Sequence, residues 1–223
     1  MKFELLIFDW DGTLMDSEAR IVACVEAAVK DLRLDSPGQD AIRNIIGLGL
    51  REAVHSLFPD AGDNLHLEVA ERYRAHFFSS NEKPSELFHG AREVIEGLFN
   101  EGYFLAVATG KGRSGLKYAL ETTDLGRFFH TTRCADETFS KPHPEMLHQI
   151  IDEMGVMPGQ ALMIGDTEYD MQMAANAKMP ALGVSYGVHS KERLLQHKPL
   201  GCLHNVSEIP GWLNGWQTDN KDL

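Results

Sequence analysis

Four short apolar runs that each end in Asp, Thr or Gly constrain the fold of this chain most strongly. The runs are LLIFD from Leu5, FLAVATG from Phe104, ALMIGD from Ala161 and ALGVSYG from Ala181. Apolar runs without polar alternation are typical of parallel strands that are buried on both faces. Helical patterns lie between them, as in AREVIEGLFNEG and PEMLHQIIDEMG. Alternating strands and helices predict an α/β fold with a doubly wound parallel sheet.

The segment that follows the first strand is too long for a simple crossover. It shows helical patterns in ARIVACVEAAVKDL from Ala19 and in LHLEVAERYRAHFF from Leu65, and no part of it predicts a strand. A chain of 223 residues can bury one good core plus a modest second unit. We therefore predict an all-helical cap, residues 16–87, inserted into an α/β core formed by residues 1–15 and 88–223.

The charge of the chain limits its partners. A net charge of −12 argues against nucleic acid and anionic membranes, which both require a basic surface. The apolar N-terminal run is too short to span a membrane, is interrupted by Asp9 and lacks the cleavage site of a signal peptide. Cys24, Cys134 and Cys202 form no C-x-x-C pattern and are expected to be reduced. We expect a cytoplasmic monomer or homodimer without a nucleic-acid or membrane partner.

Polar residues follow several of the predicted strands where each strand ends. Because open α/β sheets bind ligands at the carboxyl ends of their strands, we expect Asp9, Asp11, Thr109 and Asp166 along one edge. Carboxylates as close as Asp9 and Asp11 repel each other unless a cation lies between them or one keeps its proton. If the turn after Asp166 is helical, Asp170 lies one turn away on the same face. Mg²⁺ suits such an oxygen-rich site, so we predict a magnesium centre.

Each of these features alone has a more ordinary explanation. The Asp-Gly pair at Asp11 is typical of a turn, Asp166 of a helix N-cap, and Lys141 of a solvated surface lysine. The Thr-Gly pair at Thr109 is typical of a strand end. Only the combination of these features, in this order, favours a common site.

Four motifs give the chain a family resemblance. They are DWDGT at residues 9–13, ATG at 108–110, SKPHP at 140–144 and GDTEYD at 165–170. In this order and spacing, the chain resembles the haloacid dehalogenase-like phosphatases, specifically the subgroup with a helical cap after the first motif. The resemblance covers the chain from Phe3 to about Gly187. It implies a Rossmann-like core and a magnesium-dependent phosphatase that acts on a small phosphorylated metabolite.

The resemblance also implies a role for each motif residue. Asp9 would be the nucleophile that forms an aspartyl-phosphate. Asp11 would act as general acid and then as general base, and its backbone carbonyl would help to hold the metal. Thr109, the Gly110 N–H and the catalytic Lys141 would bind the phosphoryl oxygens.

Three further residues are assigned in the same way. Asp166 would be a metal ligand together with Asp9. Asp170 would be a further ligand, direct or through water, or would orient Lys141, and the sequence does not separate these roles. Arg51, in the candidate cap loop GLGLRE, would contact an anionic leaving group or face solvent at a helix start.

We expect the cap to determine which substrate the enzyme accepts, because the cap should contact the leaving group. The DGTLMDSE run and the GLGL segment look most like phosphoglycolate phosphatase, so phosphoglycolate is the preferred substrate. A phosphomutase similar to β-phosphoglucomutase is the alternative, and a non-catalytic phosphate-binding module is less favoured. Arg113, in the KGR cluster that follows the Thr109 motif, could reach the substrate, but surface solvation is the preferred expectation.

Overall fold

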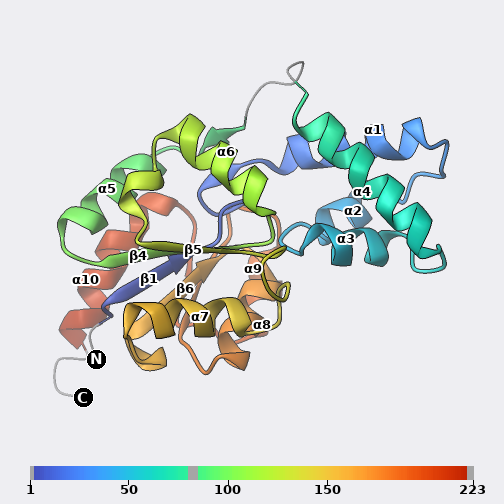
Figure 1. The fold of residues 1–223 in the computed structure, drawn as a ribbon. Helices are drawn as coiled ribbons and strands as arrows, with labels where there is room; N and C mark the ends of the chain where they lie inside the picture. Colours follow the sequence, from blue (N-terminus) through green and yellow to red (C-terminus); the bar gives the residue numbers. More distant parts are fainter. Residues whose placement is uncertain (1–2, 80–84, 220–223) are drawn as a thin grey trace.

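A six-stranded parallel sheet forms the centre of the structure (Figure 1). The computed structural model describes residues 3–79 and 85–219. The strand order is β5-β4-β1-β6-β7-β8, and every neighbouring pair is parallel. The strands are β1 (Leu5–Phe8), β4 (Phe104–Thr109), β5 (Thr131–Cys134), β6 (Ala161–Gly165), β7 (Ala181–Val184) and β8 (Cys202–Leu203).

Helices cover both faces of this sheet (Figure 1). In β1, Leu6 and Phe8 point into one apolar cluster, and Leu5 and Ile7 point into a second cluster on the opposite face. Both faces are therefore buried, which confirms the doubly wound α/β prediction. The first face carries α5 (Ala91–Asn100), α6 (Arg113–Thr123) and α10 (Ile209–Asp219), and the second carries α7 (Glu145–Met154), α8 (Glu168–Asn176) and α9 (Lys191–Leu195). Short 3₁₀ helices are η1 (Gly126–Phe128), η2 (Pro158–Gln160) and η3 (Val206–Glu208).

Four helices form a separate group beside the sheet, as Figure 1 shows. They are α1 (Glu18–Asp31), α2 (Gln39–Asn44), α3 (Leu50–Leu57) and α4 (Asp63–Phe77). They bury their own apolar side chains, with Ile21 and Val25 of α1 against Ile42 of α2, and Val54 of α3 against Val69 of α4. The expected helical cap is thus present. Its limits at residues 16 and 87 remain a prediction.

A short ribbon joins the cap to the core. Strand β2 (Met15–Asp16) pairs antiparallel with β3 (Glu86–Leu87), and Met15 lies opposite Leu87. No pattern in the sequence predicts these two-residue strands, and they lie at the two ends of the segment expected to be helical. The ribbon holds the two chain crossings between core and cap side by side.

The described helices are short. The longest of them, α4, has 15 residues, fewer than the about 20 that a bilayer requires. Within residues 3–79 and 85–219, no helix combines the length and the apolar composition needed to cross a membrane.

Candidate active site

The polar residues predicted at the strand ends lie together at one edge of the sheet. Asp9 directly follows β1, Thr109 ends β4 and Asp166 directly follows β6, and these three strands are neighbours. All three side chains are buried. The Asp9 N–H donates to the Ile164 carbonyl at 2.9 Å, which continues the β1–β6 pairing into the site.

Lys141 lies between two of the carboxylates and is not a surface lysine. Its ammonium nitrogen is 2.7 Å from Asp9 Oδ1 and 2.6 Å from Asp170 Oδ1, and its side chain is 0% exposed. The other Asp170 oxygen accepts hydrogen bonds from the Thr167 N–H and hydroxyl, at 3.1 and 2.6 Å. Thr167, and not Asp166, is therefore the N-cap of α8. Asp170 therefore contacts Lys141 directly, and whether it orients this lysine or binds a metal stays a prediction.

Three buried carboxylates form a group that fits a cation. Asp9, Asp166 and Asp170 each offer an oxygen within 4.8 Å of the others. Asp9 Oδ2 has no hydrogen-bond partner among the described residues. Because one ammonium group faces three carboxylates, the site has an excess of negative charge that a divalent cation would balance. Buried carboxylate oxygens are ligands that Mg²⁺ accepts, so the residues fit the predicted magnesium site.

The electrostatics of the cluster agree with this. The pKa of Asp9 is raised to about 7: burial is the largest cause, the ammonium of Lys141 opposes it, and the charges of Asp170 and Asp11 add to it. Burial, and then the charges of Asp9 and Asp170, raise the pKa of Asp166 well above its ordinary value. Burial alone would lower the pKa of Lys141, but Asp170 and Asp9 raise it above the ordinary value. Lys141 therefore remains an ammonium ion, and this single positive charge is shared between the carboxylates of Asp9 and Asp170.

The loop after β1 contacts the side chain of Asp166. The Thr13 hydroxyl donates to Asp166 Oδ1 at 2.9 Å, and the Val188 N–H donates to Oδ2 at 2.8 Å. Gly12 has a φ of +79°, and a Cβ at this position would lie 2.1 Å from Asp166 Oδ2. Only glycine fits this turn, which brings the loops after β1 and β6 into contact.

Asp11 is held apart from the cluster by partners of its own. The Lys111 ammonium donates to both carboxylate oxygens at 2.8 Å, and the Ser17 hydroxyl donates to one of them at 2.5 Å. Lys111 and Ser17 were not predicted as site residues, although both lie beside motifs that were. The Asp11 side chain is not part of the group of carboxylates formed around Asp9, so a metal role for Asp11 rests on its backbone carbonyl and stays a prediction.

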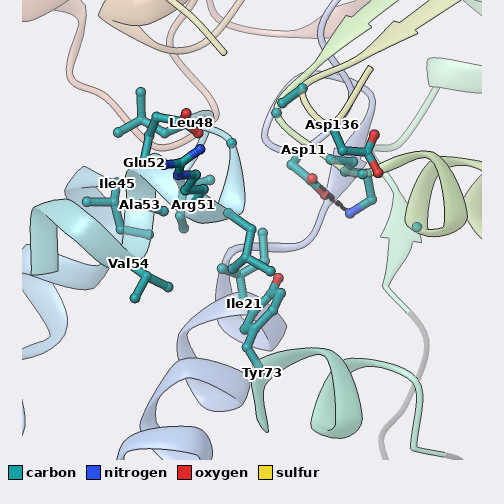
Figure 2. Close-up of a pocket in the computed structure, with 18 of the residues that line it drawn as sticks. Asp11, Ile21, Ile45, Leu48, Arg51, Glu52, Ala53, Val54, Tyr73 and Asp136 are labelled. Carbon is teal, nitrogen blue, oxygen red and sulfur yellow. Dashed lines mark hydrogen bonds and ion pairs between the residues drawn. The ribbon is translucent and has the colours of Figure 1, made fainter. Parts of the chain in front are cut away.

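A cavity of about 500 Å³ extends from Asp9, Asp11 and Thr109 into the cap. Figure 2 shows Asp11 on one side of it and helix α3 on the other, with Ile21 and Tyr73 below. The far part of the cavity is apolar. Its walls carry Ile21, Val25, Ile45, Ile46, Leu50, Val54, Leu57, Val69, Tyr73 and Phe77.

The cap is closed over the strand ends. The Gly49 N–H donates to the Ser140 hydroxyl at 2.7 Å, beside Lys141. A Cβ on Gly110 would lie 2.4 Å from the Gly47 carbonyl oxygen and 2.5 Å from that of Leu48. The predicted cap loop therefore lies directly on the Thr109-Gly110 motif, and Gly110 permits this close approach.

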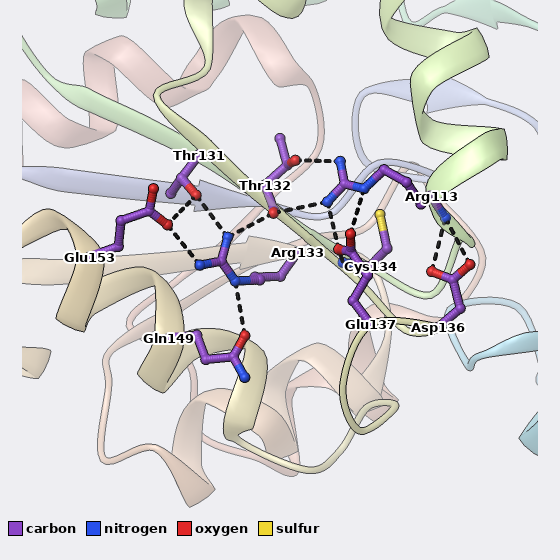
Figure 3. Close-up of polar contacts among 9 residues, drawn as sticks. All are labelled: Arg113, Thr131, Thr132, Arg133, Cys134, Asp136, Glu137, Gln149 and Glu153. Carbon is purple, nitrogen blue, oxygen red and sulfur yellow. Dashed lines mark hydrogen bonds and ion pairs between the residues drawn. The ribbon is translucent and has the colours of Figure 1, made fainter.

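The two arginines considered from the sequence have different surroundings. Arg51 is exposed, lies near the start of α3 and lines the cavity on the side opposite Asp11 (Figure 2). Arg113 instead forms an ion pair with Glu137 at 2.5 Å and donates to the Thr132 hydroxyl at 2.7 Å, as Figure 3 shows. It does not line the cavity. The Arg113 side chain ties α6 to β5 and is still 39% exposed, so it is partly solvated but also has partners of its own.

Known proteins resemble the chain over most of its length. The family model described as haloacid dehalogenase-like hydrolase matches residues 6–184. The probable phosphatase IndB of Dickeya dadantii is 35% identical, covering 93% of this chain and 92% of its own. The phosphoglycolate phosphatase of Colwellia psychrerythraea is 27% identical, covering 92% and 95%. The crystal structure of a predicted phosphoglycolate phosphatase from Haemophilus somnus shares the fold, with a TM-score of 0.84, 24% identity and coverage of 95% and 98%.

The extent of the family match decides the classification. Residues 6–184 are well over half of the chain and include all four sequence motifs, from DWDGT to GDTEYD. The parallel sheet, the helical cap and the polar strand ends agree with the match. The chain therefore belongs to the haloacid dehalogenase-like hydrolases.

Proposed function

We propose that the protein is a magnesium-dependent phosphomonoester hydrolase that acts through an aspartyl-phosphate on Asp9. The observation that carries this proposal is the buried contact of Asp9 with Lys141, beside Asp166 and two residues before Asp11. Transfer of a phosphoryl group requires a nucleophile, compensation of the negative charge on the phosphoryl oxygens, and a proton donor for the leaving group. The edge of the sheet offers one residue for each of these needs.

In the first half-reaction, an Asp9 carboxylate oxygen attacks phosphorus and the bond to the ester oxygen breaks. Asp11 gives its proton to the departing alkoxide. Thr109, the Gly110 N–H and Lys141 bind the phosphoryl oxygens and counter their charge. Mg²⁺, held by Asp9 and Asp166, would supply further charge compensation and align the phosphoryl group.

In the second half-reaction, Asp11 removes a proton from water, which attacks phosphorus and releases Asp9 and inorganic phosphate. Lys111 and Ser17 hold Asp11, which lines the cavity together with Asp9. Asp170 acts as a positioning residue in this scheme. Lys141 and Thr167 already engage its two oxygens, which supports orientation of Lys141 over direct metal binding.

The motifs and the cavity indicate the class of substrate. Phosphoglycolate is our first candidate, because the motifs resemble phosphoglycolate phosphatase and the cavity that Asp9 and Asp11 line also carries Arg51, a cation for the carboxylate of glycolate. The size of the cavity favours a second candidate class. A space of about 500 Å³ with largely apolar walls also fits a bulkier, partly apolar leaving group.

Phosphate release from a panel of esters tests the proposal. The panel contains phosphoglycolate, sugar phosphates, nucleotides and phenyl phosphate, each with Mg²⁺ and with excess chelator. We expect metal-dependent release that is abolished in Asp9→Asn, and the preferred ester identifies the leaving group. Normal turnover by Asp9→Asn contradicts the proposal, and isomerised sugar phosphate without free phosphate indicates the mutase instead.

A further inference from the structure

A second cluster of possible metal ligands lies in the cap. His55 lies in the last turn of α3, while Asp63 and His66 lie three residues apart in the first turns of α4. One ligand atom from each of these residues lies within 4.8 Å of the others. The two imidazole rings face each other with their centroids 4.1 Å apart. None of these three residues belongs to a motif of the catalytic site.

The surroundings of His66 fix its tautomer. His66 is only 7% exposed, and its Nε2 lies 2.8 Å from the Phe58 carbonyl oxygen. A carbonyl can only accept a hydrogen bond, so Nε2 carries a proton, and in the neutral ring Nδ1 carries a lone pair. This Nδ1 is buried and has no hydrogen-bond partner among the described residues. A buried acceptor without a partner is costly unless something binds it.

We propose that His55, Asp63 and His66 bind a divalent first-row transition ion such as Zn²⁺. Imidazole and carboxylate ligands suit Zn²⁺, Ni²⁺ or Cu²⁺ better than Mg²⁺, which prefers oxygen ligands. A histidine that binds a metal typically donates its other ring N–H to a carbonyl or carboxylate, as His66 does to Phe58.

Small movements complete the site. Ligand atoms around a tetrahedral Zn²⁺ at about 2.0–2.1 Å lie about 3.4 Å apart, so ligand atoms that now lie within 4.8 Å of one another need to approach by at most about 1.4 Å. His55 and Asp63 are exposed and can rotate, whereas the buried His66 provides a fixed ligand. Three protein ligands leave a fourth position open for water.

The ion would link two helices of the cap. It joins the end of α3 to the start of α4, across the turn that contains Phe58. Val54 and Leu57, on either side of His55, line the catalytic cavity, whereas His55 itself does not. Binding should therefore stabilise the cap wall of the cavity without adding a group to the reaction centre.

Zn²⁺ binding to the whole protein tests this proposal. Competition with a chromophoric chelator is measured in excess Mg²⁺, which occupies the carboxylate site, and the thermal midpoint is measured with and without Zn²⁺. The variants are His55→Gln and Asp63→Asn, which change exposed side chains, and His66→Gln. His148→Gln, on helix α7 of the core, is the matched control.

The wild type and His148→Gln should bind one Zn²⁺ per chain and gain thermal stability from it. His55→Gln and Asp63→Asn should bind at least about tenfold more weakly, because loss of even an outer-sphere partner costs this much. Equal Zn²⁺ affinity in the wild type and these two variants would overturn the proposal. Absence of Zn²⁺ binding by the wild type in Mg²⁺ would also overturn it. The variants with exposed substitutions keep the test valid if His66→Gln does not fold.

Discussion

Replacing Lys141 by Met tests the electrostatic account of the cluster, because methionine is similar in length but carries no charge. In the folded protein the substitution leaves Asp9 and Asp170 buried without the ammonium group that now lies 2.7 and 2.6 Å from them. Removing one partner of a buried ion pair costs about 3–5 kcal/mol. For a chain of this size that corresponds to a fall in melting temperature of roughly 6–20 °C.

The assay is thermal unfolding of metal-free protein, followed by titration with Mg²⁺. We expect Mg²⁺ to raise the melting temperature more in Lys141→Met than in the wild type, because the variant has a larger uncompensated negative charge. The matched control is Lys117→Met, which removes an exposed lysine whose pair with Glu121 has an N–O distance of 3.9 Å. Its stability should change by less than about 1 kcal/mol.

Two results would refute this reasoning. In the first, metal-free Lys141→Met melts at the same temperature as the wild type, so Lys141 does not compensate the carboxylates. In the second, Lys141→Met is destabilised but Mg²⁺ has no greater effect on it than on the wild type, so the cation does not bind at these carboxylates.

Three further predictions concern other parts of the site. Gly110→Ala should lower kcat/KM at least about tenfold while the protein remains folded. The added Cβ would collide with the Gly47 carbonyl oxygen and so push the cap away from the site. An unchanged kcat/KM would contradict this prediction. In chelator, metal-free wild type should lose stability relative to Asp9→Asn as the pH rises from about 4 to 7, because the folded chain holds a proton on Asp9 up to a pKa of about 7 and the unfolded chain does not. A parallel pH dependence of the two proteins would disprove this. Arg113→Met should lose about 1 kcal/mol in urea unfolding with normal kcat, since its ion pair with Glu137 is partly exposed, and a large fall in kcat would instead place Arg113 at the substrate.

The sequence predicted those parts of the fold that depend on local pattern. The strands β1, β4, β6 and β7 are apolar runs, and each is found where it was expected. Strand β5 was missed because its sequence, TTRC, is not apolar. It lies at the edge of the sheet, where a strand is less buried than in the centre and does not need a continuous apolar run. Strands β2, β3 and β8 have only two residues each, too few to carry a period.

In the candidate site, too, the sequence predicted only the residues whose positions follow from a local pattern. Asp9, Thr109 and Asp166 were predicted together because all parallel strands end at the same edge of a sheet. The contact of Lys111 with Asp11 joins residues 100 positions apart in a loop whose direction no local pattern determines. The cluster of His55 with His66 likewise depends on how α3 and α4 pack, because neither histidine lies in a metal-binding motif.

The central claim is that Asp9 carries the phosphoryl group during turnover. The most direct measurement is acid quenching of a single turnover with a substrate identified in the ester panel, followed by mass spectrometry of the peptide that contains Asp9. We predict a mass increase of one phosphoryl group on Asp9 that appears before free phosphate and then decays. Release of phosphate without any such modification at any quench time would contradict the account and would indicate direct attack by water.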